Sequence, residues 1–419
     1  MLPILYALGP FKFYIQTESG ASLPLLLCVL VAAKRYKKTQ SESDYSDSHE
    51  IIRKNTSFDL RGSLKRSFAL GAALTDPQEN VLCSPLSALL PLGKLVFGAE
   101  GQARQEITAT IGIRKRKQVK KVFTKLIQDL KFLPGVVLDV ASRIYLAKKT
   151  KLNSNFSKNV KSTFQSDVEK VSFDKPREAV DEINAWVARQ TNNMIPTILA
   201  PGDISPSTSM ILVNAIYFSG KWKYAFQKVF SSTFLSPKGP LIIPMISNVA
   251  DYNYYESKIL KSQILEIPYE GNAASFIIVL PIMKDGLQVL LRSLKLAPEI
   301  LNSEMRSLTS IRMEVSIPKF KIQSEMDLKV LYEKIGLRTI FNNKHSGLTG
   351  IVKDNTVYVS KAVHKAVIEV NEKGTEAAAS SAISIGFVTL NMRFIADHPF
   401  LFFVKVKGEQ LFAGIYNGP

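Results

Sequence analysis

The sequence predicts an α+β protein in which large β-sheets pack against helices. Amphipathic helical patterns come early in the 419-residue chain, strand-like runs dominate later, and the two do not alternate regularly. Regular alternation would favour a parallel sheet wound with helices, so its absence favours sheets and helices that are grouped separately. With 46% hydrophobic and 9% aromatic residues, the chain can bury a large core.

The helices are expected in four segments whose apolar residues recur at helical spacing. These segments are residues 86–96, 106–111, 119–130 and 179–190. The strands are expected in six runs rich in β-branched and aromatic residues, at 210–218, 275–280, 312–317, 366–370, 400–406 and 411–416. No internal repeat divides the chain, and we place one folded domain at residues 58–419.

Residues 1–57 form an N-terminal segment that carries an atypical targeting signal. Residues 23–33 are an apolar run that ends in Ala32-Ala33 and is shorter than the roughly 20 residues of a membrane span. The basic cluster at 34–38 follows this run, whereas signal peptides carry their charge before it. A secretory signal, an anchor and a mis-assigned start codon therefore all remain open. Residues 39–57 are polar and predict a flexible lead-in.

Sequons, charge and cysteines bear on the compartment and the partners. Asn55 and Asn155 are candidate glycosylation sites, which would suit a secreted, extracellular glycoprotein. Lys and Arg total 54 against 36 Asp and Glu, and the net charge of +18 favours contact with polyanions. Cys28 and Cys83 are too few for a disulfide framework, so the core must hold the fold.

The sequence contains no recognisable catalytic machinery. The four histidines, His49, His345, His364 and His398, lie far apart, and there is no HExxH, GxSxG or phosphate-binding glycine loop. We therefore expect neither an enzyme nor a metal site, and no required cofactor. Nucleic acid is also disfavoured as a partner, because the basic segment 114–125 contains a single aromatic residue, Phe123, on its apolar side.

The segment at 372–396 is the most informative part of the sequence. It contains no proline and is longer than the roughly 12–15 residues usual for a loop without a function. Its first half has small residues at alternating positions, Thr375, Ala377, Ala379 and Ser381, and also between them. Such a segment can enter a sheet as an extra strand, because its inward face needs little room. Taken alone, it fits a flexible Ala/Ser linker equally well.

Residues 372–379 (EKGTEAAA) closely resemble the hinge signature of the serpin family. The hinge residues are Glu372, Gly374, Thr375, Glu376, Ala377, Ala378 and Ala379. Six further blocks resemble serpin motifs and follow in family order, at 80–87 (NVLCSPLS), 183–187 (INAWV), 212–222 (LVNAIYFSGKW), 317–320 (IPKF), 362–366 (AVHKA) and 396–402 (ADHPFLF). The resemblance covers roughly residues 58–419 and implies three β-sheets, about nine helices and an exposed reactive-centre loop.

The resemblance implies an irreversible suicide-substrate inhibitor of serine proteases. The target protease would attack the loop and form its acyl-enzyme, and the cleaved loop would insert into the main sheet before water could release the enzyme. We expect a monomer with no catalytic residue of its own. The alternative is a non-inhibitory serpin acting as carrier, chaperone or signalling ligand. Residues 375–382 favour inhibition, because they contain no proline and a single charge, Glu376.

Family spacing places the reactive bond at Val388-Thr389. Counting fourteen residues beyond Gly374 and counting twelve back from Phe400 both reach Val388. Valine before the bond suits an elastase-like protease, whereas a shift to Phe387 or Leu390 would suit a chymotrypsin-like one.

The resemblance also assigns roles to two groups of residues outside the loop. Ser84, Ser87, Asn214 and His364 match the shutter, where strands must part, and Trp222 matches the breach, where insertion begins. A polar cluster with a purely structural role is the alternative. Arg114, Lys117, Lys120, Lys121 and Lys125 lie on the outer side of the predicted helix 119–130, where some serpins bind heparin. A sulfated glycosaminoglycan is thus one interpretation, and a solvated basic face is the other.

Overall fold

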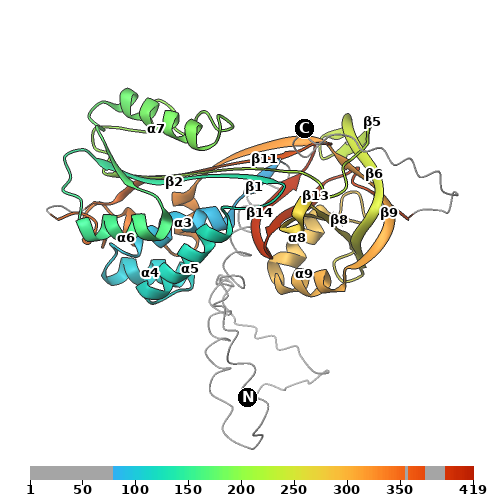
Figure 1. Ribbon diagram of the computed structural model, residues 1–419, viewed down its shortest axis with the longest axis horizontal. Coiled ribbons are helices and arrows are strands. Elements are labelled where there is room, and N and C mark those ends of the chain that lie inside the picture. The colour runs from blue at the N-terminus through green and yellow to red at the C-terminus, as the bar shows by residue number, and fades with distance from the viewer. Residues whose placement is uncertain (1–78, 354–356, 373–391) are drawn as a thin grey trace, which may run out of the picture. The chain divides into compact units, whose positions relative to one another are not determined.

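The computed structural model of the chain describes residues 79–353, 357–372 and 392–419. The α+β fold is confirmed, because these residues form two hydrogen-bonded sheets and eight α-helices (Figure 1). The expected segment 1–57, its boundary with the domain at 58 and most of the loop at 372–396 lie outside the described residues.

The five-stranded sheet has the strand order β10-β11-β4-β2-β3. Its strands are β10 (Phe320–Asp327), β11 (Val359–Val370), β4 (Met210–Gly220), β2 (Val136–Ala147) and β3 (Val168–Val171). β11 and β4 are parallel, as are β2 and β3, and the other neighbours are antiparallel. β4 is buried along its whole length, which explains its nearly continuous apolar sequence.

The nine-stranded sheet has the order β1-β14-β13-β8-β7-β6-β9-β12, with β5 also paired to β6. Its strands are β1 (Val81–Cys83), β5 (Lys228–Ser236), β6 (Gly239–Ser257), β7 (Ser262–Pro268), β8 (Ala274–Pro281), β9 (Thr309–Pro318), β12 (Met392–Ile395), β13 (Phe400–Val406) and β14 (Glu409–Tyr416). The 19-residue β6 pairs with β5 at its start, with β9 along its middle and with β7 at its end, and so joins what would otherwise be separate sheets.

Helices cover both faces of the five-stranded sheet. α3 (Pro85–Leu95), α4 (Gly101–Ile111), α5 (Arg116–Asp129) and α6 (Ser154–Phe164) lie on one face, and α7 (Pro176–Gln190) lies on the other (Figure 1). α8 (Leu287–Leu296) and α9 (Glu299–Glu304) pack beside the other sheet, and α10 (Leu328–Lys334) follows β10. Along β4, Leu212 packs among the helices of the first face and Val213 against α7, as alternation along a strand requires.

The predicted helices and strands are all present in the structure. The segments predicted at 86–96 and 179–190 correspond to α3 and α7, and the run at 400–406 is β13. α3 begins at Pro85, and the side chain of Ser84 caps it by accepting the Ser87 backbone N–H. Among the described residues, no helix is long and apolar enough to cross a membrane.

The two ends of the described chain meet at the edge of the nine-stranded sheet. β1 pairs antiparallel with β14, so that Leu82 lies opposite Gly414. Asn80 Nδ2 donates to Gly418 O at 2.6 Å, and Asn417 N donates to Asn80 Oδ1 at 2.7 Å. The strand β14 therefore has as one of its two neighbours a strand from the start of the described region, β1.

Candidate functional site: the junction between β4 and β11

The parallel pair β4 and β11 lies at the centre of the five-stranded sheet, and the segment predicted as the reactive loop follows β11 in the sequence. The two strands pair from Met210 with Val359 to Phe218 with Ile368. Only Asn371 and Glu372 follow β11 before residues 373–391, and the chain resumes at β12 in the other sheet. A segment that folded back from the end of β11 would run antiparallel to both strands. The junction can therefore accept one strand and become antiparallel throughout, which is the more stable pairing.

A buried polar cluster lies under this junction and joins α3 to both strands. Ser87 Oγ donates to Asn214 Oδ1 on β4 at 2.8 Å, and Asn214 Nδ2 lies 3.2 Å from His364 Nδ1 on β11. The Ser84 backbone N–H donates to His364 Nε2 at 3.3 Å. All four residues are fully buried, and Asn214 lies opposite His364 in the strand register. The structure thus brings the four predicted shutter residues together, while their role in strand parting remains a prediction.

His364 is held in its neutral form. Burial lowers the pKa of its imidazole from 6.5 to about 4, and a hydrogen bond to the Asn214 backbone opposes this effect only in part. Nε2 accepts the Ser84 backbone N–H, which is possible only while Nε2 carries no proton. A charged imidazole here would lose that hydrogen bond and would lack solvent.

Trp222 and Lys319 hold the chain as it leaves β11. The indole Nε1 donates to Asn371 O at 2.7 Å, and the ring stacks on Tyr269 with 4.4 Å between centroids. Lys319 Nζ pairs with Glu372 Oε2 at 2.8 Å. Trp222 therefore contacts the chain at the end of β11, and its role at the breach remains a prediction. The ion pair of Lys319 had no sequence signal, because its partner is distant in the chain.

The family follows from a comparison with known proteins. The family model described as "Serpin (serine protease inhibitor)" matches residues 65–419. The chain is a serpin. The blocks that carried the resemblance thus identified the correct family, and this serpin belongs to a family of serine protease inhibitors.

Similar proteins span nearly the whole of the folded domain of this serpin. Antichymotrypsin-2 of Bombyx mori is 36% identical over 349 residues, which covers 82% of this chain and 92% of the relative. The crystal structure of Serpin48, a highly specific serpin of the insect Tenebrio molitor, matches with a TM-score of 0.75 and 30% identity over 85% of this chain and 96% of its own. Native protease nexin-1 with heparin matches with a TM-score of 0.78 and 27% identity over 86% of this chain and 98% of its own.

Part of the site predicted for this serpin lies outside the described residues. This holds for Gly374, Thr375, Glu376, Ala377, Ala378 and Ala379 of the hinge, for Val388, Thr389, Phe387 and Leu390 at the reactive bond, and for Asn55. Glu372 is described and is ion-paired. Asn155 lies exposed in the first turn of α6, so its amide is accessible to solvent.

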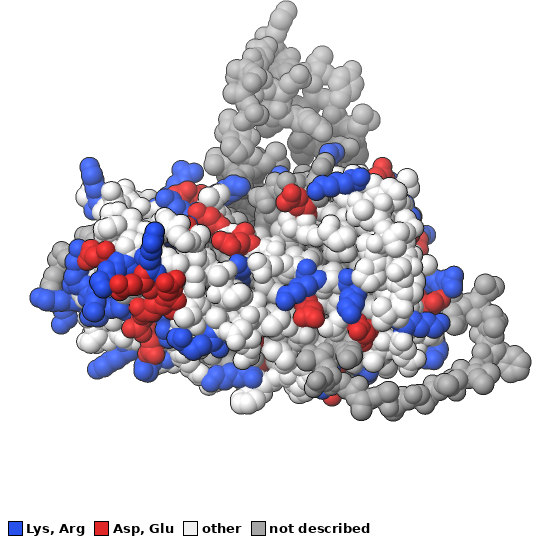
Figure 2. Space-filling view, turned by 90° about the horizontal axis from the view of Figure 1, so that it is seen from above, with Lys and Arg blue, Asp and Glu red and all other residues white. Residues whose placement is uncertain are grey.

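The outer face of α5 carries the predicted basic residues of the serpin. Val119 and Phe123 are buried beneath the helix, and Arg114, Lys117, Lys120, Lys121 and Lys125 are all exposed. Lys125 pairs with Asp129 at 2.7 Å, which leaves most of the charge of this face uncompensated within α5. On the face that carries α7, by contrast, basic and acidic side chains lie interspersed (Figure 2).

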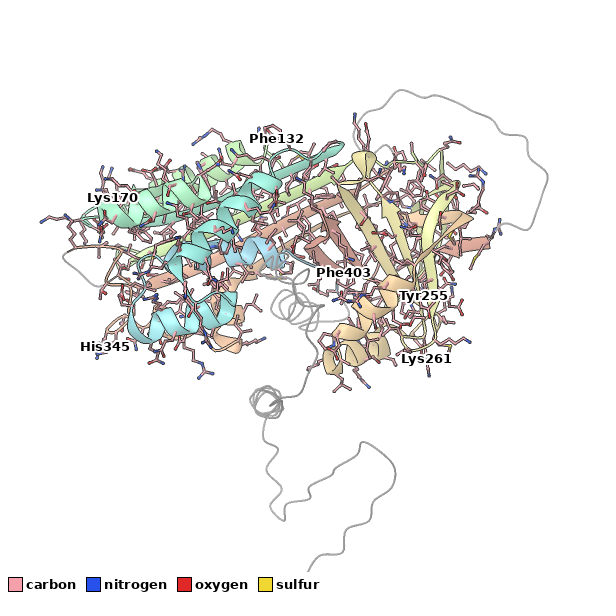
Figure 3. All side chains as sticks on the ribbon, turned by 60° about the horizontal axis from the view of Figure 1, so that its bottom comes forward. Phe132, Lys170, Tyr255, Lys261, His345 and Phe403 are labelled. Atoms are coloured by element: carbon pink, nitrogen blue, oxygen red, sulfur yellow. The ribbon has the colours of Figure 1, made fainter. Side chains whose placement is uncertain are left out.

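The described histidines of this serpin do not gather into a catalytic or metal site. His345 is exposed and points outward from its loop (Figure 3). His398 is buried, with Nδ1 2.7 Å from Asp397 Oδ1 and Nε2 2.7 Å from Pro281 O. Within the described ranges, no group of three or more His, Cys, Asp or Glu side chains could hold a metal ion.

Proposed function

We propose that this serpin irreversibly inhibits elastase-like or chymotrypsin-like serine proteases by inserting its cleaved loop between β4 and β11. The observation that carries the proposal is the parallel pairing of these strands directly beside the start of the loop. A segment of small residues follows this point in the sequence. The polar cluster of Ser84, Ser87, Asn214 and His364 supports the proposal, because its hydrogen bonds can be remade around an added strand.

The covalent step is the ordinary chemistry of the protease. The serine Oγ of the protease attacks the carbonyl carbon of Val388, and the bond to Thr389 breaks. An ester joins Val388 to the protease, and the released amine of Thr389 takes the proton that the serine lost. Insertion of the arm that ends at Val388 then carries the attached protease away and distorts its active site before water can hydrolyse the ester.

The residue at the reactive bond selects the class of protease. Val388 fits the small pocket of an elastase-like enzyme, whereas cleavage after Phe387 or Leu390 would fit a chymotrypsin-like one. Similarity to a relative named leukocyte elastase inhibitor supports the first pocket, and similarity to a relative named antichymotrypsin-2 supports the second. Mass spectrometry of the released C-terminal peptide distinguishes them, because cleavage at the proposed bond gives a peptide that begins at Thr389.

The inhibitory reaction is tested by incubating the protein with pancreatic elastase and with chymotrypsin. We expect a covalent complex that survives SDS, and cleavage without a complex would instead support the carrier, chaperone or signalling alternative. Thr375→Arg should convert the inhibitor into a substrate, because the inserting arm would have to bury a charge. The matched control is Asn391→Arg, which lies beyond the reactive bond, does not insert and should leave the complex unchanged.

We further propose that a sulfated glycosaminoglycan binds the outer face of α5 in an extracellular protein. The exposed cations of α5 support this, as does similarity to a serpin solved with heparin. The triple variant Lys120→Gln/Lys121→Gln/Lys125→Gln should elute earlier from heparin-agarose than Lys238→Gln/Lys261→Gln/Lys321→Gln, which removes equal exposed charge elsewhere. Equal elution of the two variants would show that net charge alone causes retention.

A further inference from the structure

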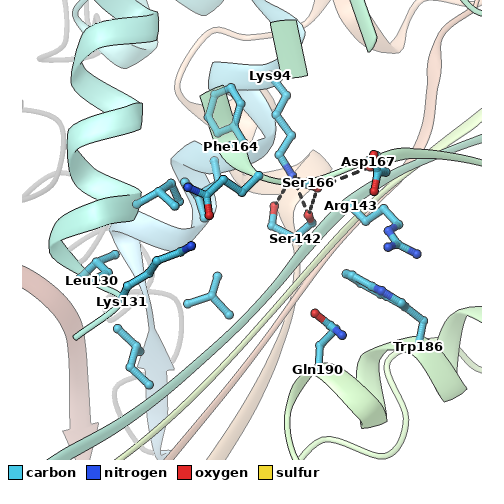
Figure 4. A pocket seen from close by; sticks show the side chains of 15 residues that line it. Lys94, Leu130, Lys131, Ser142, Arg143, Phe164, Ser166, Asp167, Trp186 and Gln190 are labelled. Atoms are coloured by element: carbon cyan, nitrogen blue, oxygen red, sulfur yellow. Dashed lines mark hydrogen bonds between the residues drawn. The ribbon is translucent and has the colours of Figure 1, made fainter. Parts of the chain in front are cut away.

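A pocket lies between α5, α6 and β2, away from the junction of β4 and β11 (Figure 4). Its volume is about 340 Å³, at the lower end of the roughly 300–1,000 Å³ of small-molecule sites. Residues of α3, α5, β2, α6 and α7 contribute to its wall. The lining combines apolar side chains on one side with Lys94, Arg143 and Ser142 on the other.

The pocket occupies the part of β2 that β3 leaves unpaired. β3 pairs only with Ile144–Ala147 of β2, so residues 136–143 have a strand partner on one side alone, β4. On the open side, Ser142 O accepts from Lys94 Nζ at 2.6 Å and from Ser166 Oγ at 2.7 Å. At this open edge the carbonyl oxygen of Ser142 therefore bonds to polar side chains instead of to the backbone of another strand. Both of these side chains line the pocket.

Lys94 is a buried cation without a carboxylate partner among the described residues. Its side chain comes from α3, its exposure is 1%, and its other bonds reach Ser142 Oγ at 3.1 Å and Ser166 Oγ at 3.0 Å. Burial, with a smaller effect from Arg143, lowers the pKa of Lys94 to about 7. All its bonds are to neutral oxygens, so nothing in this part of the structure balances its charge.

Arg143 brings a second cation to the same pocket, and one of its N–H groups has no acceptor among the described residues. Its guanidinium lies over the Trp186 ring at 4.1 Å, and its Nε is buried with no hydrogen-bond acceptor among the described residues. The nearest acid, Glu169, is 3.9 Å from Nη1, and Asp167 in the pocket wall is paired with Lys161 at 3.1 Å. Buried donors without acceptors are uncommon, and each leaves a desolvation cost unmet.

The remaining charged group of the wall is Lys131, which follows α5 and is exposed. α7 contributes the uncharged Trp186 and Gln190. Opposite the cations, the wall is apolar and includes Leu130, Leu138 and Phe164. The pocket therefore combines an excess of positive charge with a hydrocarbon surface.

We propose that this pocket binds an amphipathic organic anion, a single carboxylate on a hydrocarbon chain of about eight to ten carbons. The carboxylate accepts a hydrogen bond from Arg143 Nε and balances the positive charge of Lys94, whose three N–H groups already bond to Ser142 and Ser166. The hydrocarbon chain covers the apolar wall formed by Leu130, Leu138 and Phe164. The site is independent of the reactive loop, and its test needs no protease.

Calorimetric titration with decanoate tests the site, with decanol as the uncharged control. We expect one saturable site for decanoate with at least about tenfold weaker binding of decanol, because decanol supplies no charged acceptor. Arg143→Met should weaken decanoate binding by about tenfold and leave decanol unchanged. Lys238→Met removes an exposed charge far from the wall and should bind decanoate as the wild type does.

The pH dependence identifies Lys94 as the partner of the carboxylate. Decanoate binds the protonated lysine, so affinity should fall by about tenfold between pH 7 and pH 8.5, where decanoate itself stays ionised. This dependence should persist in Arg143→Met and disappear in Lys94→Met. If decanoate and decanol bind equally, or if Arg143→Met keeps wild-type affinity, the proposal is wrong. If Lys94→Met fails to fold, the proposal is tested by two comparisons: the affinity for decanoate of Arg143→Met against that of the wild type, and the affinity of the wild type for decanoate against that for decanol.

Discussion

His364 is the residue through which the pH of the solution most directly affects the junction between β4 and β11. From β11 it accepts the Ser84 backbone N–H at the N-terminus of α3, a hydrogen bond that only a neutral ring can make, and its Nδ1 lies beside Asn214 of β4. Burial holds its pKa at about 4, below the ordinary value of 6.5. The unfolded chain therefore takes up this proton before the folded protein does, and acid weakens the fold through this group.

We predict that the free energy of unfolding decreases as the pH is lowered, because His364 becomes protonated more readily in the unfolded chain. Because the folded-state pKa is depressed, this group destabilises the protein progressively from about pH 6.5 to about pH 4, by a total on the order of 3 kcal/mol. His364→Gln should show a shallower loss in urea titrations over this range, and His345→Gln, at an exposed position, should retain the wild-type slope. Identical slopes in all three proteins would contradict the assignment.

The residues of the site differ in how far sequence alone could reveal them. Ser84 and His364 are 280 positions apart, so no local pattern predicts their contact, and only the family blocks placed them together. Lys94 sits inside an apolar helical run, where nothing in the sequence distinguishes a buried lysine from one at the surface. Its burial depends on Ser142 and Ser166, which come from other elements and supply the oxygens that it needs.

At the scale of elements, predictability followed the strength of the local pattern. β4 and β13 are continuous apolar runs, and both were found. β6 was missed, because Pro240 and Pro244 argue against a long strand, although both lie where it pairs with the edge strand β5. α6 was missed as well, since its sequence is mostly polar and it depends on Phe156 and Val160 for burial.

The pairing of β4 with β11 gives an element-scale test of the insertion mechanism. Val213 and Val363 are paired in register and pack on the same face, so Val213→Cys/Val363→Cys should form a disulfide across the junction. We expect the oxidised variant to be cleaved without forming an SDS-stable complex, and dithiothreitol to restore the complex. Complex formation by the oxidised protein would show that the loop does not enter at this junction.

At the scale of the whole domain, the loop segment connects two different sheets. It leaves β11 in the five-stranded sheet and rejoins the chain at β12, which pairs with β9 in the nine-stranded sheet. While the loop is intact, both of its ends are fixed in place. Cleavage at Val388-Thr389 would release one end, so the arm could then complete the five-stranded sheet.

We predict that cleavage in the loop stabilises the protein rather than weakening it. Insertion adds backbone hydrogen bonds and replaces a parallel pair by two antiparallel ones, so the melting temperature should rise by more than about 10 °C. Scanning calorimetry of the protein before and after limited proteolysis measures the change. Thr375→Arg serves as the control, since it should be cleaved and show little gain. An unchanged melting temperature in the cleaved wild type would contradict insertion.

The pairing of β1 with β14 sets a condition on the biosynthesis of the protein. Asn80 bonds to Gly418 across 338 positions, so this edge of the sheet cannot form until Gly418 has left the ribosome. At roughly 5–20 residues per second, translation of the chain takes on the order of 20–80 seconds. During much of that time β1 lacks its partner β14, and the apolar strand β8 lacks its partner β13. The nascent chain should therefore depend on chaperones until Gly418 has emerged, and truncation before Asn417 should cause aggregation rather than a local defect.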